Sequence, residues 1–122
     1  MRTLEEVRAL IARGLEGDPR YTVDDVIEGL HTGEFHYFGE DKGIVITKFS
    51  GYRDKRLLVF LLVGEDLDEW KEKMTARLKG FAEKHGCSQI ECYARRGLEK
   101  SLRALGWKHE QSVLRLRIKN GR

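Results

Sequence analysis

The hydrophobic positions of the N-terminal third recur at helical spacing. Apolar residues three or four apart, with charged residues between them, predict an amphipathic helix over residues 3–16. Thr22 is placed as an N-cap, with Asp25 three residues later as an acidic form of the capping box. A second helix should therefore run from Thr22 to about His31, and Gly33 is a natural stop.

From Glu34 onward the spacing of the hydrophobic residues becomes typical of β-strands. Two runs rich in aromatic and β-branched residues, 35–38 and 44–49, lie on either side of the turn signal at 39–43 and predict a hairpin. The next run, 57–63, is apolar at every position, which is typical of a central strand covered by helices on both faces.

The second half predicts a helix over 66–85, a short strand over 88–93, a helix over 96–105 and a final strand over 112–118. In the last strand Leu114, Leu116 and Ile118 form an apolar face, which we expect to be buried. The opposite face is mostly basic and consists of Val113, Arg115 and Arg117. The predicted order is α-α-β-β-β-α-β-α-β in one α/β domain spanning 1–122. Its central sheet is mixed, mostly antiparallel and flanked by helices.

Charge and cysteine content restrict the classes of function. Bases (23) nearly balance acids (20), so the formal net charge of +3 does not indicate a nucleic-acid-binding protein. The longest apolar run is far shorter than a membrane span, and the N-terminus lacks a signal-peptide pattern, so we expect a cytoplasmic location. Cys87 and Cys92 lie about 16 Å apart along one predicted strand, which is too far for a disulfide.

Several segments together resemble a known family. The buried strand that leads into a long helix, the strand "KHGCSQIECYA" and the helix ending in "RALGWKH" resemble the GNAT acetyltransferases over essentially the whole chain. Within that family, the segment "ARRGLEKSLRALGW" after a Gly-Cys strand is most similar to short acetyltransferase-like proteins of tailed bacteriophages. The resemblance implies a GNAT-like fold.

The resemblance also implies a position for coenzyme A. In the family, a Gln/Arg-x-x-Gly-x-Gly/Ala loop after the central strand binds the pyrophosphate through backbone amides at a helix N-terminus. The corresponding residues here are Val63, Gly64, Glu65, Asp66 and Leu67. Because carboxylates replace the motif's glycines, we expect them to cap the amides internally and to oppose a phosphate. The family's terminal tyrosine corresponds to Leu102.

Two charged clusters are candidate sites. The acidic cluster Glu65, Asp66, Asp68 and Glu69 has ligands suited to a hard cation or a basic partner, although a well-capped exposed helix start explains it more simply. A basic face is formed at helical spacing and is a candidate for binding a partner protein or nucleic-acid phosphates, with a solvated face as the simpler reading. Its central residues are Arg95, Arg96, Lys100 and Arg103.

Several other residues could have a chemical role, but a structural role explains them more simply. His85, Cys87 and Cys92 have poor metal-ligand spacing, so we predict no metal site. Cys92 as a nucleophile would need His36 or His109 brought beside it by folding, and packing is the simpler role. Trp70 and Trp107 are expected in the core. The loop residues Tyr52 and Arg53 are better placed to meet a partner.

The missing phosphate loop leads to a functional hypothesis. We expect a catalytically degenerate, phage-type GNAT-fold protein that binds a protein partner, a phage structural protein, as a virion-associated or assembly accessory factor. It would be found in the host cytoplasm or the virion and would need no cofactor. The alternative is an acetyl-coenzyme A-dependent N-acyltransferase acting on an amine. A second alternative is a nucleic-acid-binding accessory domain that uses the basic face.

Overall fold

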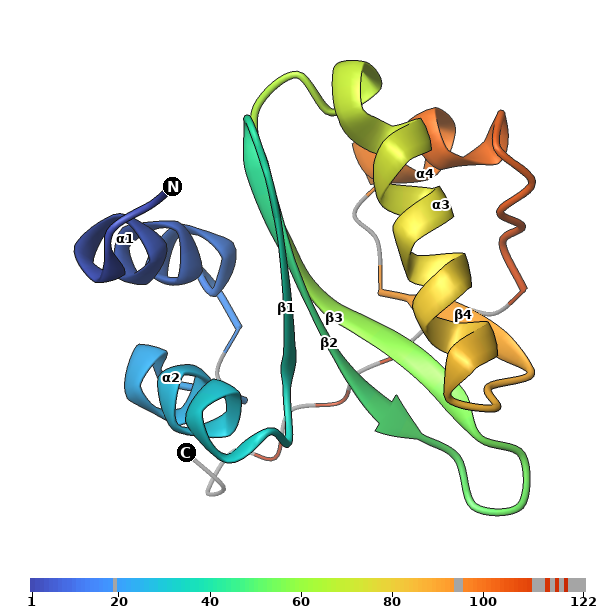
Figure 1. Cartoon of the computed structure of the whole chain (residues 1–122), viewed down its shortest axis with the longest axis horizontal. Helices are drawn as coiled ribbons and strands as arrows, with labels where there is room; N and C mark the ends of the chain where they lie inside the picture. Colours follow the sequence, from blue (N-terminus) through green and yellow to red (C-terminus); the bar gives the residue numbers. More distant parts are fainter. Residues whose placement is uncertain (19, 94–95, 111–113, 115, 117, 119–122) are drawn as a thin grey trace.

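The computed structural model describes residues 1–18, 20–93 and 96–110, together with Leu114, Leu116 and Ile118; the side chains of 96 and 97 are not described. Figure 1 shows its helices and strands in chain order. Their bounds are α1 (Leu4–Gly14), α2 (Val23–Thr32), β1 (His36–Glu40), β2 (Gly43–Ser50), β3 (Arg56–Gly64), α3 (Leu67–Lys84), β4 (Gln89–Cys92) and α4 (Arg96–Arg103). The predicted helices and the first four strands are confirmed.

The four described strands form one sheet in the order β1-β2-β3-β4. β1 and β2 make an antiparallel hairpin that closes with the pair Glu40 and Gly43, and β2 continues antiparallel to β3. β4 is parallel to β3, and α3 provides the crossover between them. The sheet is therefore mixed and mostly antiparallel, as the sequence predicted.

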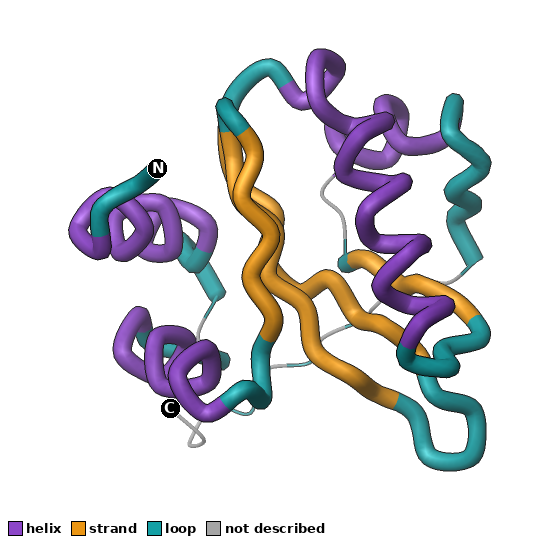
Figure 2. Tube along the Cα trace, viewed as in Figure 1, coloured by secondary structure: helices purple, strands orange, loops and turns teal. Residues whose placement is uncertain are grey.

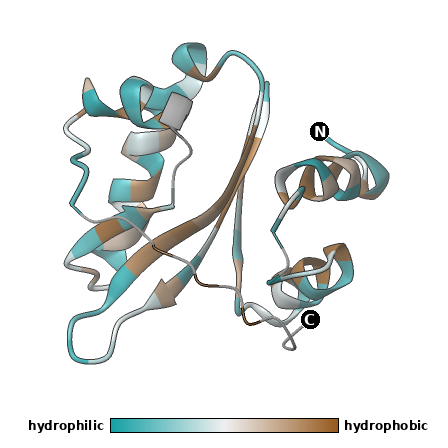
Figure 3. Cartoon of the chain, turned by 180° about the vertical axis from the view of Figure 1, so that it is seen from behind, coloured by the Kyte–Doolittle hydropathy of each residue, from teal (hydrophilic) through white to brown (hydrophobic). Residues whose placement is uncertain are grey.

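Helices cover both faces of the sheet. α1 and α2 lie on one side and α3 and α4 on the other, an arrangement visible in Figures 1 and 2. Figure 3 shows that apolar residues run along the central strands, between these helix layers. Each face has its own hydrophobic cluster, one built around Ile11, Val26 and Phe35 and the other around Trp70, Met74 and Leu78.

Local capping explains the bounds of the two N-terminal helices. Thr3 accepts a hydrogen bond from the Glu6 amide, and Thr22 accepts one from the Asp25 amide. In both cases the carboxylate accepts a hydrogen bond from the backbone amide of the threonine, so each helix begins with a capping box. α2 ends at Gly33, whose φ of 87° is the left-handed conformation that glycine adopts without strain.

The prediction of a buried final strand is wrong for the residues that can be examined. Leu114, Leu116 and Ile118 belong to no strand and are 93%, 86% and 70% exposed. The rest of the segment 112–118 lies outside the described residues. Alternation distinguishes an apolar side from a polar side, but burial also requires a surface to pack against.

Among the described residues, no helix has both the length and the apolar character needed to cross a membrane. Cys87 and Cys92 are free thiols, as their spacing predicted.

Candidate functional site

A β-bulge in the central strand organises the candidate site. Ile46 of β2 pairs with Leu61, and the next residue, Thr47, pairs with Val59. Phe60 is therefore an extra residue in β3, which explains why Phe60 and Leu61 both join the cluster beneath α1 and α2. Because a bulge bends its strand and increases its twist, β3 changes direction at this point.

β4 follows β3 only as far as the bulge. The parallel register runs from Arg56 with Gln89 to Val59 with Cys92 and ends there, whereas β3 continues to Gly64. Beyond Val59 the backbone of β3 has no strand partner on this side among the residues that the structure describes. An unpaired strand edge of this kind can hydrogen-bond an extended ligand.

A cavity of about 360 Å³ lies where the two strands separate. We call it the β3–β4 cleft. One wall is the C-terminal end of α1 and the loop after it, the floor is β3, and the other wall comes from β4 and α4. The lining residues are Gly14, Glu16, Gly17, Asp18, Arg20, Val59, Phe60, Leu61, Leu62, Cys92, Tyr93 and Leu98.

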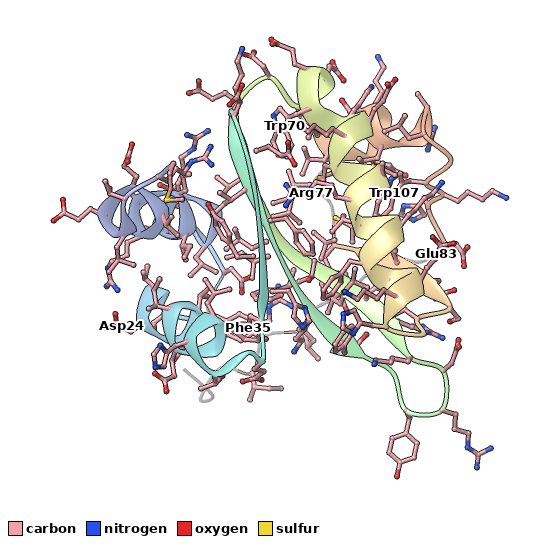
Figure 4. The ribbon with its side chains drawn as sticks, viewed as in Figure 1. Asp24, Phe35, Trp70, Arg77, Glu83 and Trp107 are labelled. Carbon is pink, nitrogen blue, oxygen red and sulfur yellow. The ribbon has the colours of Figure 1, made fainter. Side chains whose placement is uncertain are left out.

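The turn from β3 into α3 continues from the open part of β3. The Glu65 amide donates to the carbonyl of Lys42, and the Trp70 indole donates to the carbonyl of Glu65, both at 2.8 Å. Trp70 extends from the first turns of α3 and is labelled in Figure 4. These two bonds hold the turn against the β1–β2 hairpin and fix the direction in which α3 begins.

The carboxylates at this turn do not cap the helix, contrary to our prediction. Asp66 is the N-cap residue but has a left-handed backbone (φ 50°, ψ 50°) and makes no side-chain cap bond. Its carboxylate instead accepts from Lys42, which also binds Glu69. Within the described part of the chain, the amides of Asp66, Leu67 and Asp68 have no acceptor. Such amides at a helix N-terminus attract anions.

Basic side chains offset much of the negative charge at this turn. The hydrogen bonds that Lys42 donates to Asp66 and to Glu69 raise the pKa of Lys42, and a hydrogen bond from Lys71 lowers the pKa of Asp68. Arg13, from the last turn of α1, donates to the carbonyl of Gly64 at 3.1 Å and lies 4.0 Å from the Glu65 carboxylate. The described residues contain no group of three or more side chains suited to hold a metal ion.

The structure does not assemble the predicted basic face into a described site. Arg95 lies outside the described residues, as does the side chain of Arg96. Lys100 is exposed, and Arg103 binds Glu99 at 3.3 Å within the same helix. The side chains that can be placed therefore form a solvated helix surface with an internal ion pair.

For the remaining candidate residues, the contacts favour a structural role over a catalytic one. His36 contacts Thr47 at 3.0 Å and His109 contacts Glu99 at 3.1 Å, so each histidine has a partner other than Cys92. Burial raises the pKa of the Cys92 thiol to about 12, which opposes a nucleophilic role. Both tryptophans pack in the cluster beneath α3, as predicted, and Tyr52 is fully exposed in its loop.

Sequence reasoning missed Arg13, Glu16 and Tyr93 as residues of the site. Arg13 and Glu16 lie at the end of the helix predicted over residues 3–16, where they matched an ordinary polar face. Tyr93 directly follows β4 and reaches the cleft because β4 pairs with β3 up to Cys92. These residues could have been found by predicting that the short strand β4 pairs in parallel with the central strand β3.

Comparison with known proteins places this geometry in a fold family. No protein-family model matches the chain, and neither does any curated protein. Solved structures do match. The crystal structure of a probable acetyltransferase has a TM-score of 0.72 at 13% identity, over 98% of this chain and 96% of its own.

Two further solved structures are similar over most of their length. A predicted acetyltransferase with acetyl-CoA from Clostridium acetobutylicum has a TM-score of 0.71 at 12% identity, covering 93% of this chain and 89% of its own. The aminoglycoside N-acetyltransferase AAC(6')-Iy in complex with CoA has a TM-score of 0.70 at 15% identity, covering 95% and 88%. The order of elements, the mixed sheet and these neighbours agree with the resemblance seen in the sequence: the chain has the fold of the GNAT acetyltransferases.

Proposed function

We propose that this protein binds an acyl-coenzyme A and transfers the acyl group to an amine. The observation that supports this most directly is the β3–β4 cleft, which opens at the Phe60 bulge on the strand that leads to the unbonded amides of α3. The structural neighbours include proteins described with acetyl-CoA or CoA, and this likeness adds an argument from fold alone.

The residues present fit such a ligand. The amides of Asp66, Leu67 and Asp68 would hold phosphate oxygens, and Arg13 would add a positive charge beside them. The unpaired edge of β3 from Phe60 would hydrogen-bond the amide groups of an extended arm. When bound, the ligand would supply the acyl thioester, whose carbonyl carbon is the electrophile for an amine.

The chain's own residues would prepare the acceptor. Glu16 and Asp18 bring carboxylates to the wall of the cleft formed by the loop after α1. Asp18 binds Arg20 at 2.8 Å, whereas the exposed Glu16 would attract a protonated amine from solution. Val59, Leu61 and Leu62 of β3 form the floor of the cleft beneath this wall.

The carboxylates near the turn from β3 into α3 should weaken the affinity for the ligand's phosphates. Glu65 and Asp68 remain well exposed beside the amides, and a carboxylate about 6 Å from a phosphate costs on the order of 1–3 kcal/mol at an effective dielectric of 20–50. We therefore expect binding in the micromolar range or weaker.

Calorimetric titration with acetyl-CoA and with CoA tests the proposal. We expect both to bind the wild-type protein and Arg13→Ala to weaken binding by about tenfold, because a charge-assisted contact to phosphate is lost. Arg8→Ala is the matched control, since Arg8 lies on the same helix but pairs with Asp24. Absence of binding at millimolar ligand would contradict the proposal, as would equal affinities for the Arg13 and Arg8 variants.

A second candidate is a catalytically degenerate protein that binds a partner in a phage particle or during its assembly. The features that favour it are the exposed carboxylates Glu65 and Asp68 at the expected phosphate position and the fully exposed Tyr52 in the β2–β3 loop. Mass spectrometry of purified particles and assembly intermediates from infected cells tests it. Absence of the protein from both would remove this candidate.

A further inference from the structure

Arg20, on the wall of the β3–β4 cleft, is held in place by contacts from two sides of the chain. Its backbone amide, Nε and Nη2 donate to the Asp18 carboxylate at 3.0, 3.0 and 2.8 Å. Its guanidinium carbon also lies 5.6 Å from the centre of the Tyr93 ring, which belongs to the wall formed by β4 and α4. The guanidinium is therefore fixed at the cleft, although the side chain is still 44% exposed.

The contact with Asp18 leaves one edge of the guanidinium unused. The N–H groups of an arginine lie in one plane and can bind a carboxylate along more than one edge. Asp18 takes the edge formed by Nε and Nη2, and Nη1 makes no hydrogen bond to any described residue. The edge formed by Nη1 and Nη2 is open, and its parallel N–H groups match the two oxygens of a carboxylate.

A carboxylate of the protein lies on the same wall. Glu16 precedes Arg20 by four residues in the loop after α1, and both residues line the cleft. Gly17 lies between them with a φ of 75°, and a methyl group added there would meet no described atom within 4 Å. The backbone that separates the acid from the base is therefore uncovered, and a ligand can reach both groups from the cleft.

The charges of this wall favour a ligand that carries one negative and one positive group. Glu16 and Asp18 outnumber Arg20, so a phosphate group with two negative charges would be repelled. A carboxylate carries a single charge, and an ammonium group on the same molecule would be attracted to Glu16. A free amino acid has both groups, whereas a simple amine would leave the open edge of Arg20 without a partner.

We propose that the cleft binds a free amino acid as the acceptor of the acyl group. The carboxylate of the amino acid binds the Nη1 and Nη2 edge of Arg20, and its amine lies toward Glu16. The acceptor role rests on the proposed acyltransferase function, whereas binding of the amino acid can be measured without coenzyme A. Asp18 and Tyr93 are positioning residues in this arrangement, because they act through the guanidinium that they hold.

Saturation-transfer NMR tests the proposal with the standard L-amino acids, each compared with the amine that its decarboxylation would give. We expect at least one amino acid to bind about tenfold more tightly than its amine, because only the carboxylate pairs with Arg20. Arg20→Lys keeps the charge but loses the paired donors, so it should weaken binding of that amino acid about tenfold and leave the amine unchanged. The matched control is Arg8→Lys, since Arg8 also binds an aspartate, at 2.7 Å, but lies outside the cleft lining.

A kinetic measurement connects this binding to acyl transfer. With acetyl-CoA as donor, Arg20→Lys should raise the KM for the amino acid about tenfold with little change in kcat, because Arg20 holds a group that does not react. The decarboxylated amine should have the same KM in both proteins. It therefore also reports whether the variant keeps the fold of the cleft.

The outcomes separate this assignment from the function on which it rests. If coenzyme A does not bind but an amino acid binds through Arg20, the acyltransferase proposal falls and the amino acid site stands. If coenzyme A binds and no amino acid binds more tightly than its amine, the acyltransferase proposal stands and the amino acid site is overturned. Equal weakening of the amino acid and the amine in Arg20→Lys would also overturn it, since Arg20 would then support the cleft rather than recognise a carboxylate.

Discussion

Burial favours the neutral form of two titratable side chains, Cys92 and His36, and so moves their pKa values in opposite directions. It raises the pKa of the Cys92 thiol, and it is the main cause that lowers the pKa of His36. The imidazole of His36 packs against Phe49 and Phe81, with ring centres 4.6 and 4.9 Å away. The nearby charges of His85 and Lys55 lower the His36 pKa further.

His36 should therefore make the protein less stable in acid. The folded state holds His36 with a pKa below its ordinary 6.5, so the unfolded chain binds more protons as the pH falls through that value. The free energy of unfolding should fall as pH drops from 7 toward 5, with His36 contributing a slope of at most about 1.4 kcal/mol per pH unit. Urea unfolding across this pH range measures the slope.

The His36→Gln variant should flatten this dependence, because glutamine can still bond to Thr47 but does not titrate. His31→Gln is the control, since His31 is exposed at the end of α2. If the two variants have the same pH slope, His36 is not the group responsible.

At the scale of elements, one ion pair ties the edge strand β1 to the long helix α3. The Glu40 carboxylate is almost completely buried and accepts a short hydrogen bond from Arg77 of α3, which is labelled in Figure 4. Arg77 also donates to the carbonyl of Gly39 at 2.8 Å. Because β1 is an edge strand of the described sheet, this arginine occupies a carbonyl that would otherwise be open to pairing with another chain.

Removing the arginine alone should be the costliest way to break this pair. In Arg77→Met the buried carboxylate keeps only Lys73, at 3.9 Å, so we expect a loss of about 2–3 kcal/mol in unfolding free energy. Glu40→Gln should cost less, because a neutral amide is easier to bury. The double variant should be more stable than Arg77→Met. Urea unfolding of all three provides the cycle, and additive losses would contradict this account.

At the scale of the whole molecule, the sequence predicted the features that depend on local residue patterns, such as helix starts and apolar strands. Thr22 and Asp25 define the start of α2 within three residues, and the wholly apolar run 57–63 identified the central strand. The cleft could not be predicted in this way, because it depends on the Phe60 bulge and on the parallel pairing of β4. Arg13 and Tyr93 are 80 residues apart in the chain, and only the fold brings them to adjoining parts of one site.

The two hydrophobic clusters lie on opposite faces of one sheet, and this arrangement predicts cooperative unfolding. Ile11 lies fully buried on the α1 and α2 face, whereas both tryptophans belong to the opposite cluster. Ile11→Val should cost about 1 kcal/mol, and tryptophan fluorescence should report the same decrease in urea midpoint as circular dichroism. The exposed-loop variant Tyr52→Ser should leave both midpoints unchanged. If fluorescence kept the wild-type midpoint in Ile11→Val while circular dichroism did not, the two faces would unfold separately, and the shared strands β2 and β3 would not couple them.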